Sequence, residues 1–508
     1  MIIAEKIKLL YVDLFCGAGG TSTGVENAHY HGDKCAKVIA CVNHDPNAIA
    51  SHNANHPEAL HFIEDIRTLE MSRVMPHIVA KRKEYPNAHV VLWASLECTN
   101  FSKAKGGLPR NADSRTLAEH LFRYIEAIQP DFIQIENVEE FMSWGDLDEN
   151  GHPIEKLKGS SYIKWVNNVK AYGYDFEYRI LNAADYGAIT SRKRFFGQFA
   201  RHGLPIVFPK QIYAKDGKDG HKPWKAVKSA IDFSDEGSSI FNRKKPLVEK
   251  TLERIYAGLI KFVAGGEDAF LIKYNSMNGK TGKYIPPSVN APCPTVACQN
   301  RLGIAKVHFL SKQFSGHPQS KNVSVDEPAG TLTCKDHHAL ATVFLANQYG
   351  HGGGQLGDIE APCSTVMTTP KQNLVTVKKH YLANPYSFKS NGCSIDKPCF
   401  TLVARMDKVP PYLISTESGL PIQLCEGDSP MTILIKQFML LYGIVDIKMR
   451  MLKIDELKLI MGFPKNYVLV GTVAEQKKYI GNAVEVHMSQ ALCESLCEGL
   501  EIYQRKAI

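Results

Sequence analysis

Apolar runs of strand length alternate with amphipathic stretches of helix length over the first two hundred residues. Residues 8–15 (KLLYVDLF) form the first apolar run, and a glycine-rich turn leads from it into a helical pattern at about Ser22. Further apolar runs, AKVIACV, HVVLWASL and DFIQIENV, end near Asn43, at Leu96 and at Val138, the last after the helical pattern TLAEHLFRYIEAI. Strands separated by helices of this length predict a mostly parallel, doubly wound α/β sheet. Such sheets bind ligands at the carboxyl ends of their strands, so we expect functional residues directly after them.

The pattern changes beyond about residue 205. A lysine-rich stretch without helical or strand periodicity precedes a helical pattern over residues 246–264, and helical patterning returns from about residue 436. We therefore predict a first domain over residues 1–204, an inserted second domain over residues 205–435, and a segment over residues 436–508 that completes the first domain.

The inserted region contains an internal repeat. The pattern Pro-x-x-Thr followed by Val or Leu occurs with Thr295, Thr331, Thr365 and Thr401, and each copy precedes a short apolar run such as FLANQY. A Pro-led turn that feeds a strand is the simplest structural interpretation of one copy. Repetition at this period indicates a repeated supersecondary unit. The second domain is therefore expected to be strand-rich, with about four repeats.

Composition narrows the class of protein. Of the 508 residues, 44% are hydrophobic and 22% charged, as in soluble globular proteins. No apolar run approaches the length of a membrane span, and the first residues lack a secretion signal, so we expect a cytoplasmic protein without a membrane partner. The 13 cysteines lie singly, without zinc-like spacing, which predicts reduced thiols and no metal site. A net charge of +8 permits a polyanionic partner without requiring one.

Glycine and polar residues follow the first strands. In the turn DLFCGAGG, glycines allow the backbone to approach a ligand closely, although a tight connection alone would explain them. Polar groups also follow the next two strands, at Asn43-His44-Asp45 and Glu64-Asp65-Ile66. Together these segments would line one cleft suited to a nucleoside with a charged tail.

Cys98 directly follows the third strand, in the segment SLECTNFS. This position favours an exposed, reactive thiol, whereas a free cysteine is more often a small buried apolar residue. The residues from Ser102 to Arg115 (SKAKGGLPRNADSR) are glycine-rich and basic. We expect them to form a mobile lid over a phosphate backbone.

Glu136 ends the fourth strand, in the run IQIENV. Burial of a carboxylate is costly unless it is hydrogen-bonded or protonated, and a raised pKa would make Glu136 a proton donor. Arg192 and Arg194 alternate on an extended segment, so their side chains should point the same way. They would suit a phosphate or a base edge, although a solvated charge run is the other interpretation.

In order along the chain, these segments resemble the motifs of the cytosine-5 DNA methyltransferase family, whose methyl donor is S-adenosylmethionine. The similar motifs are the DLFCGAGG turn, the Cys98 segment ending Asn-Phe-Ser, Glu136-Asn-Val, Asp185-Tyr-Gly leading to Arg192-x-Arg194, Met461-Gly-Phe-Pro and Gly481-Asn-Ala-Val. The resemblance covers roughly residues 8–200 and 448–495, and residues 205–435 fall where the family keeps its target-recognition domain. It implies a Rossmann-like methyltransferase sheet and DNA (cytosine-5-)-methyltransferase activity.

The resemblance also implies roles for single residues. Cys98 would add to carbon 6 of a cytosine flipped out of duplex DNA, so that carbon 5 can attack the methyl group. Glu136 would protonate or hydrogen-bond N3, and Arg192 and Arg194 would hold the base and its phosphate. Ser102, Arg115 and Thr190 would contact DNA. S-adenosylmethionine would be bound by Asp13, Phe15, Gly17, Gly19, Gly20, Asn43, His44, Asp65, Ile66, Asn482, Ala483 and Val484. The implied partner is double-stranded DNA, with nucleoid association when bound, and a cognate restriction endonuclease acting separately is left open.

Three positions depart from the family pattern. Glu97 stands where proline usually precedes the nucleophile, and Thr190 stands where glutamine is usual. Asn43 replaces the acidic residue that usually binds the cofactor ribose. Asn43 can still accept one hydrogen bond, which predicts weaker cofactor binding, or Asp45 substitutes for it. Two alternatives stay open: an RNA (tRNA) cytosine-5 methyltransferase, although that branch has a short target region, and a non-catalytic DNA-binding relative.

Overall fold

The computed structural model describes residues 6–96, 116–260 and 425–507, apart from short gaps within 146–153, 231–242 and 426–445. Between residues 261 and 424 it describes the backbone of separate strands only. The chain divides into two compact units. The first comprises Met1–Lys225, Phe400–Arg405 and Leu457–Ile508, and the second comprises Ala226–Cys399 and Met406–Glu456. The predicted domain boundaries at residues 204 and 435 stay a prediction, because compact units need not coincide with independently folding domains.

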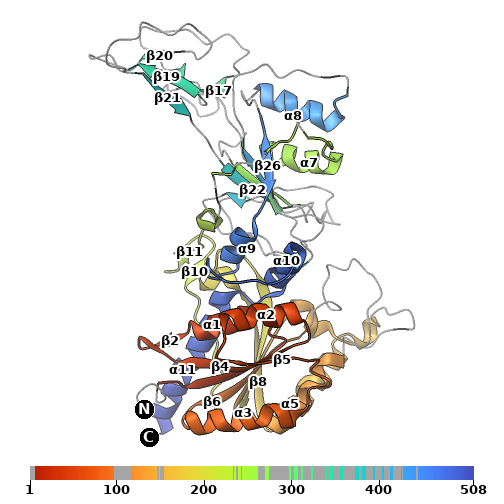
Figure 1. Ribbon diagram of the computed structural model, residues 1–508, viewed down its shortest axis with the longest axis vertical. Coiled ribbons are helices and arrows are strands. Elements are labelled where there is room, and N and C mark those ends of the chain that lie inside the picture. Colours follow the sequence, from red (N-terminus) through yellow and green to blue (C-terminus); the bar gives the residue numbers. More distant parts are fainter. Residues whose placement is uncertain are drawn as a thin grey trace. The chain divides into compact units, whose positions relative to one another are not determined.

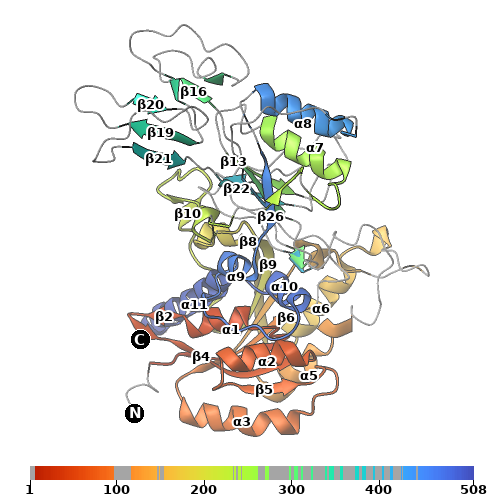
Figure 2. The same ribbon diagram turned by 45° about the horizontal axis from the view of Figure 1, so that its top comes forward.

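The first unit is built on a seven-stranded sheet, which Figures 1 and 2 show from two directions. The first five strands in its spatial order are mutually parallel, and the last two run antiparallel to their neighbours. In this order the strands are β5 (Leu60–Ile63), β4 (Ala36–Asn43), β1 (Leu9–Leu14), β6 (His89–Ser95), β7 (Phe132–Asn137), β9 (Lys193–Arg201) and β8 (Tyr174–Asn182). The predicted mostly parallel, doubly wound sheet is confirmed.

The apolar runs form strands because the sheet is covered on both faces, so that every residue of β1 and β7 is buried. One face packs against α3 (Met71–Glu84), α5 (Leu121–Ile128) and α6 (Ser160–Lys170). The other face packs against α1 (Gly20–Glu26), α2 (Pro46–Asn55) and α11 (Val486–Ala507). The predicted helix over residues 116–128 is a 3-10 turn at Thr116–Ala118 followed by α5.

Helix α11 brings the end of the chain against its beginning. A Cβ atom on Gly24 of α1 would lie 2.4 Å from the Val486 carbonyl oxygen and 2.0 Å from Ser489 Oγ, so the two helices approach at a glycine. The preceding helix, α10 (Val473–Asn482), starts with a capping box in which Thr472 and Glu475 bond each other's backbone N–H groups. The segment from Leu457 onward is thus part of the first compact unit.

In the second unit, helices α7 (Glu249–Gly258) and α8 (Pro430–Leu441) lie side by side, and the ring of Tyr256 packs edge-on against Phe438. The apolar runs after the four repeats coincide with strands, and these divide among three sheets. They are β16 (Leu310–Lys312), β19 (Val343–Asn347), β22 (His380–Asn384) and β25 (Tyr412–Ser415). All of their pairings are antiparallel. Strand β16 pairs with β17 (Asn322–Val323) and β18 (His338–Ala339), and β19 pairs with β20 (Gln355–Gly357) and β21 (Gln372–Thr376). Strand β22 pairs with β15 (Leu302–Lys306), β23 (Cys393–Ser394) and β25, and β25 also pairs with β26 (Lys448–Met451).

The repeat threonines and their prolines lie outside the described residues, so the Pro-led turn stays a prediction. The remaining strands of the chain are β2 (His29–Tyr30), β3 (Asp33–Lys34), β10 (Tyr213–Ala214), β11 (Lys222–Pro223), β12 (Ser238–Ser239), β13 (Ala269–Lys273), β14 (Ala297–Cys298) and β24 (Val403–Ala404). Helix α9 (Ile454–Ile460) follows β26. Among the helices that the structure describes, none combines the length and the apolar character that a bilayer crossing requires.

A buried ion pair holds the end of β26 in the second unit. The Arg450 guanidinium makes two hydrogen bonds to Glu456, of 2.9 and 2.8 Å, and these side chains are only 9% and 4% exposed. We expect Glu456→Gln to lower the free energy of unfolding by about 3–5 kcal/mol, because it removes the buried carboxylate of Arg450 and leaves only the more exposed Asp235 carboxylate, 3.6 Å away. Urea denaturation followed by circular dichroism measures this.

The matched control is Lys453→Gln, which removes a half-exposed partner of Asp232 and should cost about 1 kcal/mol or less. Equal, small losses for the two variants would contradict the importance of the buried pair.

Candidate functional site

The first site segment is the turn between β1 and α1. Asp13, at the end of β1, is fully buried and accepts a hydrogen bond of 2.8 Å from the Ser22 hydroxyl through Oδ2. Its other oxygen, Oδ1, has no hydrogen-bond partner among the described residues. Burial raises the pKa of Asp13 to about 7, although the bond from Ser22 opposes the rise. A buried oxygen without a partner is unusual and indicates that a polar group of a ligand could bond to Asp13 here.

The turn is tightly packed against the end of the chain. Gly19 has a φ of 101°, a conformation that favours glycine, and a Cβ atom there would lie 2.3 Å from the Tyr467 hydroxyl. A Cβ atom on Gly20 would lie 2.4 Å from the Val484 carbonyl oxygen. Phe15 and Gly17 also have positive φ, of 60° and 52°. The DLFCGAGG and GNAV motifs, remote in sequence, are therefore in direct contact.

The polar residues that follow β4 are engaged in hydrogen bonds within the protein. The Asn43 side-chain oxygen accepts a 2.9 Å hydrogen bond from the backbone N–H of Asp45. The Asp45 carboxylate caps α2 and accepts two hydrogen bonds of 3.0 Å from the Tyr479 hydroxyl. His44 between them is exposed. The Asp45 carboxylate is thus already engaged in holding α2 and α10 in place.

The residues after β5 are also held by neighbours. Asp65 pairs with Arg67 at 2.6 Å, and the hydrogen bond from Arg67 lowers the pKa of Asp65. Ile66 is buried in the core, and its carbonyl oxygen accepts a 2.9 Å hydrogen bond from the Tyr124 hydroxyl. These contacts therefore hold Asp65 and Ile66 in place after the carboxyl end of β5.

A second site segment is centred on Glu136, at the end of β7. Glu136 is 5% exposed and lies beside Ser95 of β6 in the sheet register. The Arg194 Nε atom lies 3.2 Å from Glu136 Oε1. Burial raises the pKa of Glu136, and the positive charges of Arg194 and then Arg192 oppose this rise. The buried carboxyl group predicted from IQIENV is therefore found, with both arginines as its electrostatic partners.

These groups line one small cavity. Arg192 is buried and donates a 3.1 Å hydrogen bond to the Gly481 carbonyl oxygen, which ties it to the GNAV motif. The lining residues are Glu136, Ala183, Arg192, Arg194, Phe196, Val484, Glu485 and Met488. The alternating arginines do face the same side, as their spacing predicts. The cavity thus joins three motifs that are far apart in the sequence.

Sequence reasoning missed Glu485. This buried carboxylate accepts hydrogen bonds from the Met488 backbone N–H, at 2.9 Å, and from His487 Nδ1, at 2.7 Å, and it raises the pKa of His487. Gly462 must be glycine here, because its φ is 79° and a Cβ atom would lie 2.6 Å from Glu485 Oε1. In the sequence, Glu485 could have been found as the acidic residue that directly follows the GNAV motif.

Several predicted site residues are not brought to this cavity by the described part of the chain. Cys98, Ser102 and Arg115, together with Glu97, lie outside the described residues. Thr190 is fully buried, and its hydroxyl has no hydrogen-bond partner among the described residues. The roles predicted for these four site residues stay predictions.

Comparison with known proteins supports the family resemblance that these motifs suggest. The profile of the C-5 cytosine-specific DNA methylase family matches residues 9–254 and 407–498, roughly two thirds of the chain. The Type II methyltransferase M.BspRI of Lysinibacillus sphaericus is 29% identical over 276 residues, which are 49% of this chain and 60% of the relative. M.XorII of Xanthomonas oryzae pv. oryzae, also a Type II methyltransferase, is 31% identical over 204 residues, 38% of this chain and 41% of the relative.

The chain therefore spans 60% or less of the length of these two relatives. A solved methyltransferase structure from Entamoeba histolytica aligns with 97% of this chain and 98% of its own at a TM-score of 0.44 and 10% identity, too low a likeness to carry an argument. The family assignment rests on the profile match, which extends over both ends of the first unit and follows the motifs that the fold brings together. The chain belongs to the C-5 cytosine-specific DNA methylase family.

Proposed function

We propose that this protein transfers a methyl group from S-adenosylmethionine to carbon 5 of a cytosine flipped out of double-stranded DNA. The observation that carries the proposal is the buried Glu136 carboxyl group, held with Arg192 and Arg194 around one cavity at the carboxyl end of β7. A proton donor or acceptor beside two fixed positive charges suits a pyrimidine ring whose electrons must be redistributed.

Cys98 is the proposed nucleophile. Ser95, the last residue of β6, lies beside Glu136, and Cys98 follows three residues later in the sequence. Three peptide units span at most about 11 Å, and this short reach supports Cys98 as the nucleophile for the Glu136 cavity. Addition of the Cys98 thiolate to carbon 6 forms a sulfur–carbon bond and moves the ring's π electrons toward N3 and carbon 5.

Glu136 controls the charge that develops on the ring. Because burial raises its pKa, Glu136 keeps its proton to a higher pH than an exposed glutamate, and it can donate this proton to N3 as the thiolate adds. Arg192 and Arg194 then stabilise the glutamate that results and the phosphate of the flipped nucleotide. After methyl transfer, a base removes the carbon 5 proton, and the electrons of that carbon–hydrogen bond form the carbon 5–carbon 6 double bond as the Cys98 thiolate leaves. The proton on N3 returns to Glu136.

The turn after β1 fits S-adenosylmethionine, which supplies an electrophilic methyl group when bound. Asp13 offers a buried oxygen without a partner among the described residues, and Gly19 and Gly20 allow the turn to pack directly against Tyr467 and Val484. Of the two candidates for the ribose hydroxyls, Asp45 has both carboxylate oxygens bonded to Tyr479 and also caps α2, whereas the Asn43 side-chain oxygen accepts one hydrogen bond, from the Asp45 backbone, and has a second lone pair to offer. A neutral amide there agrees with weaker cofactor binding.

The packing of Gly20 gives a testable consequence. We expect Gly20→Ala to weaken S-adenosylmethionine binding, because the new methyl group would lie 2.4 Å from the Val484 carbonyl oxygen and displace the turn. Overpacking of this kind costs about 1–3 kcal/mol, or roughly 5- to 150-fold in affinity. Isothermal titration calorimetry measures the change. Gly427→Ala, at a position where a Cβ atom meets nothing within 4 Å, is the control and should bind as wild type does.

The function itself is tested with radiolabelled S-adenosylmethionine on duplex DNA and on total tRNA. We expect label in DNA at 5-methylcytosine, and a covalent adduct with duplex DNA that contains 5-fluorocytosine. Label in tRNA alone would show the RNA activity, and the absence of both transfer and adduct would show a DNA-binding relative without catalysis.

The names of the relatives, Type II methyltransferases, support a restriction endonuclease that acts separately on the same DNA sequence. Association with the nucleoid when bound to DNA follows from the proposed function, whereas the endonuclease is a separate proposal that rests on these names.

A further inference from the structure

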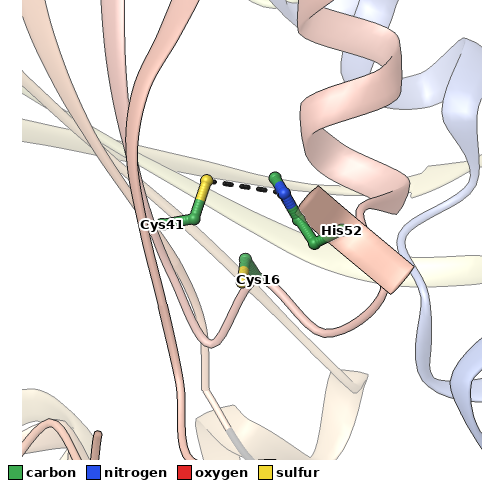
Figure 3. A group of neighbouring side chains, drawn as sticks. All are labelled: Cys16, Cys41 and His52. Carbon is green, nitrogen blue, oxygen red and sulfur yellow. Dashed lines mark hydrogen bonds between the residues drawn. The ribbon is translucent and has the colours of Figure 1, made fainter. Parts of the chain in front are cut away.

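A second group of side chains gathers behind the turn of the DLFCGAGG motif. Cys16 lies in the turn, Cys41 in β4 and His52 in α2, and all three are buried. Their sulfur and ring nitrogen atoms lie within 4.8 Å of one another, and Cys41 Sγ is 3.4 Å from His52 Nε2. Figure 3 shows Cys41 and Cys16 on neighbouring segments, with the His52 ring facing the Cys41 sulfur.

These separations are close to those of a zinc site. Zinc–sulfur bonds of about 2.3 Å and zinc–nitrogen bonds of about 2.0 Å place sulfur and nitrogen ligands roughly 3.6 Å apart in a tetrahedron, and two sulfurs roughly 3.8 Å apart. The 3.4 Å between Cys41 Sγ and His52 Nε2 is near the first value. The other two pairs of ligand atoms lie within 4.8 Å of each other, so they would have to approach by at most about 1.2 Å to reach these ligand distances.

Hydrogen bonds hold the His52 ring with Nε2 toward the cysteine sulfurs. His52 Nδ1 lies 2.8 Å from His61 Nε2, so His61 orients the ring as a second group orients metal-binding histidines. On the other side of the ring, His52 Nε2 lies 3.4 Å from Cys41 Sγ and 2.9 Å from the Ser22 hydroxyl. Because Ser22 gives its proton to Asp13, His52 Nε2 donates to Ser22, and this proton would move to Nδ1 when a zinc ion takes its place.

Charge also favours this set of ligands. Two thiolates and a neutral imidazole balance the two positive charges of a zinc ion, which makes the bound group neutral and inexpensive to bury. The Ser22 hydroxyl lies 2.9 Å from His52 Nε2 and offers an oxygen for a fourth position.

We propose that Cys16, Cys41 and His52 bind a structural zinc ion. Binding converts both thiols to thiolates and releases their two protons to solvent. The ion would join the turn after β1, the strand β4 and the helix α2, three elements separated in sequence. The ligands are 25 and 11 residues apart, which is why no zinc-like spacing is visible in the sequence.

A second cluster of cysteines is the alternative zinc site, and it also supplies the control variant for the experiment. Cys35, Cys493 and Cys497 are buried, and their sulfurs also lie within 4.8 Å of one another. Three thiolates around one zinc ion would leave a net negative charge inside the apolar cluster of α1, α11 and the sheet. The site that contains His52 is therefore favoured.

The test uses the full chain, reduced and stripped of metal under anaerobic conditions. Titration with Zn²⁺ against a chromophoric chelator should show one tightly bound equivalent, and X-ray absorption of the zinc-loaded protein should show two sulfur neighbours with nitrogen or oxygen in the remaining positions. A shell of three sulfurs would assign zinc to Cys35, Cys493 and Cys497. Either that shell or the lack of a stoichiometric equivalent would overturn the proposal.

Variants extend the test. His52→Gln and Cys41→Ser should lose the tight equivalent, Cys493→Ser should keep it, and His61→Gln should weaken it by about 10- to 100-fold. Loss in Cys493→Ser with retention in His52→Gln would refute the assignment. Because X-ray absorption needs only the wild-type chain, the result does not depend on whether every variant folds.

Discussion

Cys98→Ala should abolish methyl transfer, with turnover reduced by more than about 10⁴-fold, or about 5.4 kcal/mol of transition-state stabilisation. Without the thiolate, carbon 5 of cytosine is too weak a nucleophile to attack a sulfonium methyl group. The measurement is single-turnover transfer of radiolabel from S-adenosylmethionine to duplex DNA. DNA binding and cofactor binding should persist, since alanine removes only the thiol.

A matched substitution separates loss of the nucleophile from loss of a cysteine. Cys425 is an exposed cysteine in the second unit, and Cys425→Ala should leave turnover unchanged. The Cys98→Ala protein should form no covalent adduct with 5-fluorocytosine DNA, and the Cys425→Ala protein should form it normally. An adduct on Cys98→Ala would mean that another residue attacks the base.

Glu136→Gln should lower kcat by about 10²- to 10⁴-fold, the usual range for removal of a general acid. Glutamine keeps the size of the side chain but cannot give a proton to N3. Because burial raises the pKa of Glu136, the protonated fraction that is active falls as pH rises through that pKa. The wild-type rate of methyl transfer should therefore fall with rising pH over this range, and the variant should lose this dependence.

Glu139→Gln is the control, because Glu139 is exposed and lies three residues away. It should retain both the wild-type rate and the wild-type pH profile. Glu136→Gln at the wild-type rate would remove Glu136 from the proton transfer.

The sequence predicts the parallel part of the sheet because β1, β4, β6 and β7 are continuous apolar runs, as expected of strands buried on both faces. It does not predict β8, where most residues between Phe176 and Ile180 are exposed. Such an edge strand gains its place from pairing with β9, and its own residues do not reveal it.

The site residues likewise differ in whether the local sequence reveals them. Glu136, Arg192 and Arg194 could be predicted because each stands out in its local sequence, as a carboxylate that ends an apolar strand or as alternating cations. Glu485 and the group of Cys16, Cys41 and His52 could not, because each depends on partners brought near only by the fold. Local patterns encode single side chains well, whereas they carry little information on which remote side chains meet.

The contact of Gly20 with Val484, and of α1 with α11, has a consequence for synthesis of the protein. The two halves of this contact are separated by roughly 460 residues. At about 5–20 residues per second, a ribosome needs roughly half a minute to a minute and a half to make the stretch between them. During that interval the apolar cluster that contains Val25 and Ala28 lacks its members on α11, among them Leu492 and Leu496. The packing of the first unit can therefore be completed only after α11 has been synthesised.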